Sequence, residues 1–305
     1  MEPKIIVIAG PTCSGKTSLS LNLSEKVKSE IISADSRQFY RHLNIGTAKP
    51  TKKELRKVKH HLIDFLEPIK TYNASMFEKD AILIIEQIIE KDKIPIVVGG
   101  SGLYIKALVD GIFDNVETDN KIREELLNKK KKFGNEYLFE ELKKVDPKSA
   151  LNLLPQNWKR IIRALEVYKS TGKPIWKHQE EYKREIDFNF LQFGLNWDRT
   201  ILYKNIEARV DKMIELGLVN EVKQILDKGI SANCNSLNTV GYKEIIEFLN
   251  NNITLERAIE LIKRNTRRYA KRQMTWFRKD ERIKWFDVKS ANDFPEIAGK
   301  ILKNI

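Results

Sequence analysis

A glycine-rich segment near the amino terminus contains the residue types that bind phosphate groups. It fits the pattern G-x-x-x-x-G-K-[ST] with the residues Gly10, Pro11, Thr12, Cys13, Ser14, Gly15, Lys16 and Thr17. Glycines let successive backbone N–H groups point inward at a diphosphate, and the helix expected after the loop adds partial positive charge. Lys16 supplies a full charge, and the Thr17 hydroxyl is a ligand for Mg²⁺. This phosphate-binding loop (P-loop) predicts a polyphosphate site without specifying which polyphosphate.

The carboxylates near the predicted strand ends help to indicate which reaction takes place at this polyphosphate site. A kinase or ATP-hydrolysing enzyme normally adds a strand that ends in Asp and holds Mg²⁺ against the nucleotide. Here the strand expected at residues 94–98 runs into Gly99, and Asp35 is the only carboxylate that we expect at the end of a core strand. Ligands of α/β sheets bind at such ends, so Asp35 is a candidate general base. A helix N-cap or a Mg²⁺-shell residue is the alternative role for Asp35.

The elements around these residues alternate between strands and helices. Short β-branched runs predict buried strands, and apolar residues at helical spacing predict helices. We expect strands at 5–9, 30–34, 94–98, 188–195 and 283–288, and helices at 18–28, 75–91, 158–170, 200–216, 218–228, 255–279 and 291–302. The alternation predicts an α/β fold with a P-loop NTPase-like core, in which helices cover both faces of a parallel sheet.

One region interrupts this alternation. From about residue 117 the pattern is helical and highly charged, and no strand is expected until residue 188. We predict that residues 1–116 and 188–305 form the core domain and that residues 117–187 form a helical insertion domain.

The charge balance favours a polyanionic partner. The chain has 55 Lys and Arg against 42 Asp and Glu, a formal net charge of +13. This surplus attracts nucleic acid or an anionic membrane, although the Lys-, Asn- and Ile-rich composition of an AT-biased genome would produce it too. No apolar run approaches the ~20 residues that span a bilayer, so we expect a soluble cytoplasmic protein with nucleic acid as the stronger partner. Cys13 and Cys234 are the only cysteines, which excludes a disulfide framework and a four-cysteine zinc site.

Eight motifs follow one another in a recognisable order. They are GPTCSGKT (10–17), DSRQFY (35–40), GTAKP (46–50), HHLID (60–64), VVGGSGLY (97–104), RALEVY (163–168), GYKE (241–244) and TRRYAKRQMTWFR (266–278). With them the chain resembles the tRNA dimethylallyltransferases, also called tRNA isopentenyltransferases, over about residues 4–280. The resemblance implies an enzyme that moves a dimethylallyl group from dimethylallyl diphosphate to N6 of adenosine 37 in the tRNA anticodon loop and releases diphosphate. It also implies that the helical insertion grips the tRNA. From the P-loop we expect Mg²⁺ as the cofactor, and we expect a monomer with no obligate protein partner and no membrane.

The resemblance implies roles for individual residues as well. Residues 10–17 would hold the diphosphate of dimethylallyl diphosphate and not ATP, with Thr17 on the metal. The catalytic residues would be Asp35 as the base at the adenine, Ser101, and Arg209 at the diphosphate. The implied tRNA contacts are Asp35, Ser36, Arg37, Gln38, Ser101, Arg123, Lys159, Arg160, Ile161, Ile162 and Arg163. Ser101 stands where most relatives have Thr, and Cys13 where relatives often have Ala; Cys13 is read as a packing residue or as an oxidisable thiol.

Several other residues have two interpretations. His60 and His61 are adjacent, and on a strand they would point in opposite directions, which disfavours a metal pair. The basic run Arg264, Arg267, Arg268, Lys271 and Arg272 fits a solvated helical face or contacts with the phosphate backbone. Residues 129–132 are four lysines, interpreted as solvent-facing charge or as a tRNA contact. Two other functions remain open: a P-loop kinase of a small metabolite, and an RNA-binding P-loop protein without catalysis.

Overall fold

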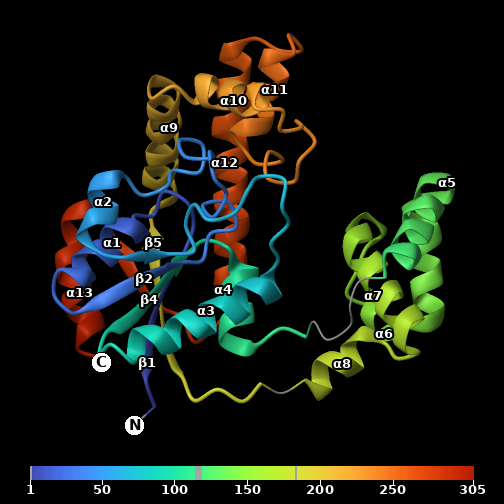
Figure 1. The fold of residues 1–305 in the computed structure, drawn as a ribbon, viewed down its shortest axis with the longest axis horizontal. Helices are drawn as coiled ribbons and strands as arrows, with labels where there is room; N and C mark the ends of the chain where they lie inside the picture. The colour runs from blue at the N-terminus through green and yellow to red at the C-terminus, as the bar shows by residue number, and fades with distance from the viewer. Residues whose placement is uncertain (1, 114–118, 183) are drawn as a thin grey trace. The chain divides into compact units, whose positions relative to one another are not determined.

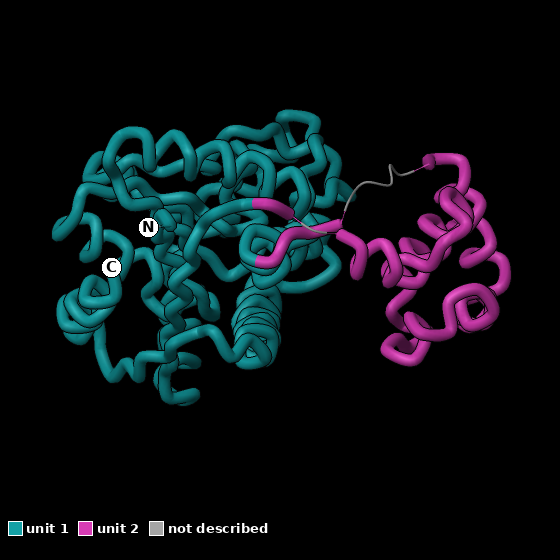
Figure 2. Tube along the Cα trace, turned by 90° about the horizontal axis from the view of Figure 1, so that it is seen from below, with its two compact units in different colours: residues 1–109, 186–305 teal, residues 110–185 magenta. Residues whose placement is uncertain are grey.

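The computed structural model describes residues 2–113, 119–182 and 184–305. The chain divides into two compact units, Met1–Val109 with Ile186–Ile305, and Asp110–Glu185 (Figure 2). The first predicted domain boundary, at residues 116 and 117, lies outside the described residues. The second was predicted at residues 187 and 188, and the division falls at Glu185 and Ile186.

A six-stranded parallel sheet forms the centre of the first unit (Figure 1). Its strands are β1 (Lys4–Ala9), β2 (Ser29–Ser33), β3 (His60–His61), β4 (Ile94–Gly99), β5 (Asn189–Trp197) and β6 (Lys284–Val288). Their order is β3-β2-β4-β1-β5-β6, and every pair is parallel. The parallel sheet of the predicted α/β fold is confirmed, and the short strand β3 is an addition to the five predicted strands. Strands β2, β3 and β4 lie on one side of β1, and strands β5 and β6 lie on the other side. Ligands of α/β sheets bind at the point where the strand order reverses in this way.

Helices of the first unit cover both faces of this sheet. They are α1 (Lys16–Ser24), α2 (Lys52–Lys57), α3 (Ala74–Ile89), α4 (Gly102–Asp110), α9 (Arg199–Glu215), α10 (Leu218–Asp227), α11 (Tyr242–Leu249), α12 (Leu255–Phe277) and α13 (Phe294–Leu302), the last preceded by the 3₁₀ turn η2 (Ala291–Asp293). Leu19 of α1 and Phe294 of α13 share one apolar cluster with Ile6 of β1. Ile5 and Val7 point to the opposite face, where they are fully buried. The helix α3 packs against β2 and β4, and its buried residues lie outside that cluster.

The second unit is helical. It contains α5 (Asn120–Val145), α6 (Pro147–Ala150), the 3₁₀ turn η1 (Pro155–Asn157), α7 (Trp158–Thr171) and α8 (Ile175–Glu181). Gly134 has a φ of 89°, so α5 consists of two helical segments joined at this residue. Leu126, Leu142 and Leu165 lie in a core of the unit's own. In the described part of the chain, no helix is both long and apolar enough to cross a bilayer.

Candidate active site

The P-loop connects β1 to α1 and is held by contacts on several sides. The Ser14 hydroxyl donates to the Pro11 carbonyl at 2.9 Å, and the Trp197 indole N–H donates to the Ser14 carbonyl at 2.9 Å. Gly15 has a φ of 84°, and a Cβ there would lie 2.2 Å from the Phe294 ring. Only glycine fits this position, because both its backbone conformation and the close approach of α13 exclude a side chain.

Lys16 lies in this loop as a half-buried cation. Its ammonium group donates to the Pro11 carbonyl at 2.5 Å. Burial lowers the pKa of Lys16 to about 8; the nearby Asp35 carboxylate opposes this shift, and the Arg209 guanidinium adds to it. An anion that enters the site stabilises the charged form of such a lysine, because its attraction replaces the hydration that burial removed.

Two cavities meet beside the loop. The first has a volume of about 480 Å³, and its lining includes residues 12–17, Asp35, Gln38, Thr47, Arg209 and Tyr269. The second, of about 330 Å³, shares Thr12, Cys13, Asp35, Thr47, Arg209 and Tyr269 with the first. The fold thus brings most of the predicted P-loop residues, Asp35 and Arg209 to one site. Gly10 and Pro11 are absent from both linings.

Asp35 follows β2 at the boundary of both cavities. Its Oδ1 accepts from the Arg37 backbone N–H at 2.9 Å, within the turn formed by residues 36–39. The first helix after it is α2, which begins only at Lys52. The alternative role as a helix N-cap is therefore wrong, whereas the roles of base and Mg²⁺-shell residue remain open.

Asp35 is not the only carboxylate at this edge of the sheet, and that prediction was wrong. Asp198 directly follows β5, and it accepts from the backbone N–H groups of Thr200 and Ile201 as the N-cap of α9. Asp198 lines neither cavity. The sequence prediction ended the strand at residue 195 and so missed that β5 extends to Trp197.

Arg209 and Ser101 have different relations to the cavities. Arg209 of α9 points its guanidinium at the P-loop, with Nη1 at 3.4 Å from the Thr12 hydroxyl and 3.5 Å from the Cys13 thiol. Ser101 is absent from both linings. Its hydroxyl instead accepts from the Ser36 backbone N–H at 2.8 Å, so the contact that it makes here is with the turn that carries Asp35.

Comparisons with known proteins identify the family. The family model described as IPP transferase matches residues 38–280. The chain belongs to this family. It is 45% identical to a tRNA dimethylallyltransferase of Pelotomaculum thermopropionicum over 303 residues, which cover 99% of this chain and 96% of the relative. It is 47% identical to that of Carboxydothermus hydrogenoformans over 291 residues, covering 94% of this chain and 93% of the relative.

Solved structures of similar proteins agree with this result. The tRNA isopentenylpyrophosphate transferase of Bacillus halodurans is 40% identical with a TM-score of 0.73, and the match covers 99% of this chain and 96% of that protein. A eukaryotic dimethylallyltransferase acting on tRNA is 29% identical with a TM-score of 0.84, and the match covers 98% of this chain and 77% of that protein.

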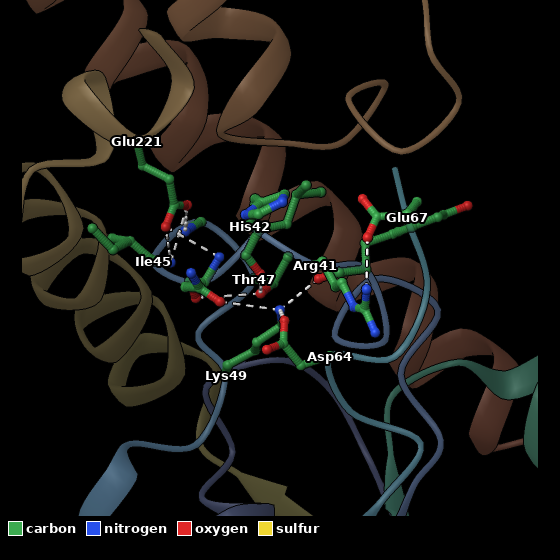
Figure 3. A network of polar contacts seen from close by, with 12 residues as sticks. Arg41, His42, Ile45, Thr47, Lys49, Asp64, Glu67 and Glu221 are labelled. Atoms are coloured by element: carbon green, nitrogen blue, oxygen red, sulfur yellow. Dashed lines mark hydrogen bonds and ion pairs between the residues drawn. The ribbon is translucent and has the colours of Figure 1, made fainter. Parts of the chain in front are cut away.

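The segment 44–49, which contains most of the GTAKP motif, is held by Glu221, a residue that the sequence analysis did not single out. The Glu221 carboxylate of α10 accepts from three successive backbone N–H groups, those of Asn44, Ile45 and Gly46, at 2.8–3.2 Å (Figure 3). It also accepts from the Tyr242 hydroxyl at 2.7 Å. A Cβ on Gly46 would lie 2.4 Å from the Tyr242 ring, so the glycine of this motif fits the tyrosine of the GYKE motif.

Lys49 of the same motif is buried in a cage of oxygen atoms (Figure 3). Its ammonium group donates to the Tyr40 carbonyl, to Asn44 Oδ1 at 3.0 Å and to Asp64 Oδ1 at 2.6 Å. Burial lowers the pKa of Lys49, and the bond to Asp64 opposes that shift. Because Lys49 lines the first cavity, this cage fixes one of its walls.

Some of the residues predicted to contact tRNA from the second unit are exposed, and others are buried. Lys159 and Arg160 are exposed at the start of α7. Ile161 and Ile162 are at most 1% exposed and belong to the core of the unit. Their side chains therefore pack inside the unit, and the prediction that they contact tRNA is corrected, since a helix of this unit must bury one of its faces. Arg123 donates at 2.9 Å to the carboxylate of Glu166, a residue that is 1% exposed.

The adjacent histidines His60 and His61 make contacts within the protein. His60 Nδ1 is 2.9 Å from the Val58 carbonyl, and His61 Nε2 is 2.6 Å from the Glu30 carboxylate. Among the described residues, no group of three metal-ligating side chains occurs.

The residues of the basic run on α12 have different surroundings. Arg267 pairs with Glu207, whereas Arg272 lines the second cavity. Of residues 129–132, Lys129 pairs with Glu125 and Glu141, and Lys130 lies 4.3 Å from the centre of the Trp158 ring.

Proposed function

We propose that this protein transfers a dimethylallyl group from dimethylallyl diphosphate to N6 of adenosine 37 in the anticodon loop of tRNA. The observation that carries the proposal is that Asp35 lies where a cavity containing Lys16 and Arg209 meets a second cavity. A cationic site for a leaving diphosphate and a carboxylate for a proton are the two groups that this reaction requires. The names of the tRNA dimethylallyltransferase relatives support the same reaction.

The first cavity binds the diphosphate. When the C–O bond of the allylic ester breaks, negative charge accumulates on the departing oxygens, and donors aimed there stabilise the transition state. Lys16, Arg209 and the P-loop N–H groups are those donors. The chain has no Asp-Asp pair of the kind with which ordinary prenyl transferases hold Mg²⁺ on a diphosphate, so the P-loop takes over that task.

Asp35 receives the proton. The N6 amine forms a bond to C1 of the allyl group, the C1–O bond breaks with its electron pair on diphosphate, and one N6 proton passes to the Asp35 carboxylate. The amine is a poor nucleophile because its lone pair is delocalised into the ring, so proton acceptance assists the bond formation. The adenine reaches Asp35 through the second cavity, and a base in a single-stranded loop can be unstacked at low cost.

The residues present fit a magnesium ion. Thr17 and Asp35 line the same cavity, and hydroxyl, carboxylate and phosphate oxygens are the ligands that Mg²⁺ takes in phosphate sites. Thr17 would hold the ion, which would neutralise charge on the diphosphate when bound.

The second unit supplies the tRNA grip. Lys159, Arg160 and Arg163 lie within a single turn of α7, and Arg123 pairs with Glu166 on the same helix. The turn 35–38 and Ser101 complete the predicted contacts from the first unit. We also propose that the protein acts as a monomer in the cytoplasm.

The test is mass spectrometry of tRNA nucleosides after incubation with dimethylallyl diphosphate and unmodified tRNA. The expected product is adenosine 37 carrying one dimethylallyl group, with one diphosphate released per transfer and no requirement for ATP. ATP hydrolysis stimulated by tRNA, without transfer, would refute the proposal. The kinase alternative is disfavoured because β4 ends in Gly99 and not in Asp.

A further inference from the structure

A buried glutamine on α12 joins the two halves of the candidate site. Gln273 is 7% exposed, and both polar atoms of its amide are bonded to backbone groups. Its Oε1 accepts from the Thr12 N–H of the P-loop at 2.9 Å. Its Nε2 donates to the Gly100 carbonyl, directly after β4, at 2.8 Å.

The Gly-rich segment after β4 is shaped to receive α12. A Cβ on Gly100 would lie 2.3 Å from Gln273 Nε2, and a Cβ on Gly102 would lie 2.2 Å from the Trp276 ring. A side chain at Gly102 would meet the bulky Trp276 ring, and one at Gly100 would displace the Gln273 amide, so both glycines fit the close approach of α12. The VVGGSGLY and TRRYAKRQMTWFR motifs therefore form a single contact surface.

This contact continues to Asp35 through Ser101. The Ser101 N–H donates to the Ala34 carbonyl at 3.2 Å, and the Ser101 hydroxyl accepts from the Ser36 N–H at 2.8 Å. Asp35 lies between these two residues, so Ser101 holds the backbone on both sides of the carboxylate. Gly100 precedes Ser101 directly, and the Gln273 amide thus connects the loop that binds diphosphate to the turn that carries the base.

We propose that Gln273 is a positioning residue that sets the P-loop relative to the Asp35 turn. The inference rests on the proposed function, because it assumes that a group held at the P-loop reacts next to Asp35. Misplacement of reacting groups by about 1 Å costs about 10²-fold in rate. A buried amide with both atoms bonded is suited to this role, because it resists displacement from either end.

The experiment measures single-turnover transfer to tRNA for the wild type and for Gln273→Met, which keeps the side-chain length and removes both hydrogen bonds. We expect the rate at saturating substrates to fall about 10–100-fold. Gln273 itself lines the first cavity, but Lys16 and Arg209, the charged donors to the diphosphate, are untouched. Affinity for inorganic diphosphate with Mg²⁺ should therefore change less than threefold. A rate within twofold of the wild type would overturn the proposal, as would a loss confined to diphosphate affinity.

Two further variants separate positioning from folding. Gln273→Asn carries the same amide on a side chain that is one methylene shorter and cannot reach both partners, so its transfer rate should fall as well. A wild-type rate for Gln273→Asn would refute the proposal, even if Gln273→Met does not fold. Gln192→Met controls for the replacement of a buried glutamine by methionine, because Gln192 is 3% exposed and, unlike Gln273, lines neither cavity. The control should keep the wild-type rate, and an equal loss there would mean that removal of any buried amide slows the reaction.

The connection through Ser101 has its own test in a double variant. If Gln273 and Ser101 act in one chain of contacts, Gln273→Met with Ser101→Ala should be within threefold of the slower single variant. Losses that multiply would contradict the connection. A wild-type protein that transfers nothing would instead refute the proposed function, so the two failures are distinguishable.

Discussion

The carboxylate of Asp35 carries the mechanism at the scale of single residues. Asp35→Asn preserves the shape of the side chain and an oxygen for the Arg37 N–H, but it removes the charge that accepts a proton. We expect the single-turnover rate at saturating tRNA to fall by about 10²–10⁴-fold, with little change in substrate affinity. A defect that is fully restored across a Mg²⁺ series would instead assign Asp35 to the metal shell. Asp198→Asn is the control: it alters a carboxylate at the same sheet edge that lines neither cavity, and Asn caps helices as well as Asp does.

Lys16 predicts how diphosphate affinity depends on pH. Burial lowers its pKa to about 8 in the free protein, and a bound diphosphate raises that pKa again by favouring the charged form. Below pH 8 the ammonium group is charged, so affinity should not depend on this group. Above pH 8 the affinity should fall, by at most about tenfold per pH unit for a single proton. Inorganic diphosphate itself loses protons between pH 6.5 and 9.5, so the affinity is compared by calorimetric titration with that of Lys16→Arg, which stays charged. Above pH 8 the wild type should lose affinity relative to Lys16→Arg. A ratio of the two affinities that is flat over this range would contradict the assignment.

At the scale of elements, α10 stabilises the loop that walls the first cavity. Glu221→Gln would replace a charged acceptor of three backbone N–H groups and the Tyr242 hydroxyl by a neutral amide. Hydrogen bonds to charged groups contribute about 1.5–3 kcal/mol each, so we expect the free energy of unfolding to fall by at least about 2 kcal/mol. Urea denaturation measures the change.

The matched control for Glu221 lies in the same network (Figure 3). The side chains of Glu67 and Arg41 are 45% and 51% exposed, and Glu67→Gln removes the ion pair between them. Exposed pairs contribute about 0–1 kcal/mol, so Glu67→Gln should leave the unfolding midpoint nearly unchanged. Equal effects of the two variants would mean that burial of Glu221 among the N–H groups has no special role.

At the scale of the whole molecule, the surplus of positive charge predicts salt-sensitive binding of tRNA. Each phosphate contact that is lost should reduce the slope of log affinity against log salt by about 0.7–0.9. Lys159→Gln with Arg160→Gln should therefore weaken binding of an anticodon stem-loop and lower the slope by about 1.5, while affinity for diphosphate stays unchanged. The control is Lys212→Gln with Lys300→Gln, which lowers the net charge by the same amount at two ion-paired lysines of the first unit. It should change the tRNA affinity and the slope much less. An unchanged slope for the α7 variant would exclude Lys159 and Arg160 as contacts to tRNA phosphates.

The amino-acid sequence by itself determined the features that depend on neighbouring residues. The P-loop, the five longer strands and the longer helices follow from spacing within short segments, because hydrophobic period and glycine placement act locally. The shorter helices α2, α4, α8 and α11 were not predicted individually. Contacts between distant residues were decided only by the tertiary structure. Gln273 reaches the Thr12 N–H across 261 positions, Glu221 reaches Ile45 across 176, and Ile161 is directed into a core and not to the surface. The physical reason is that strand order and helix packing determine which distant groups meet, and one sequence contains no local signal of that order.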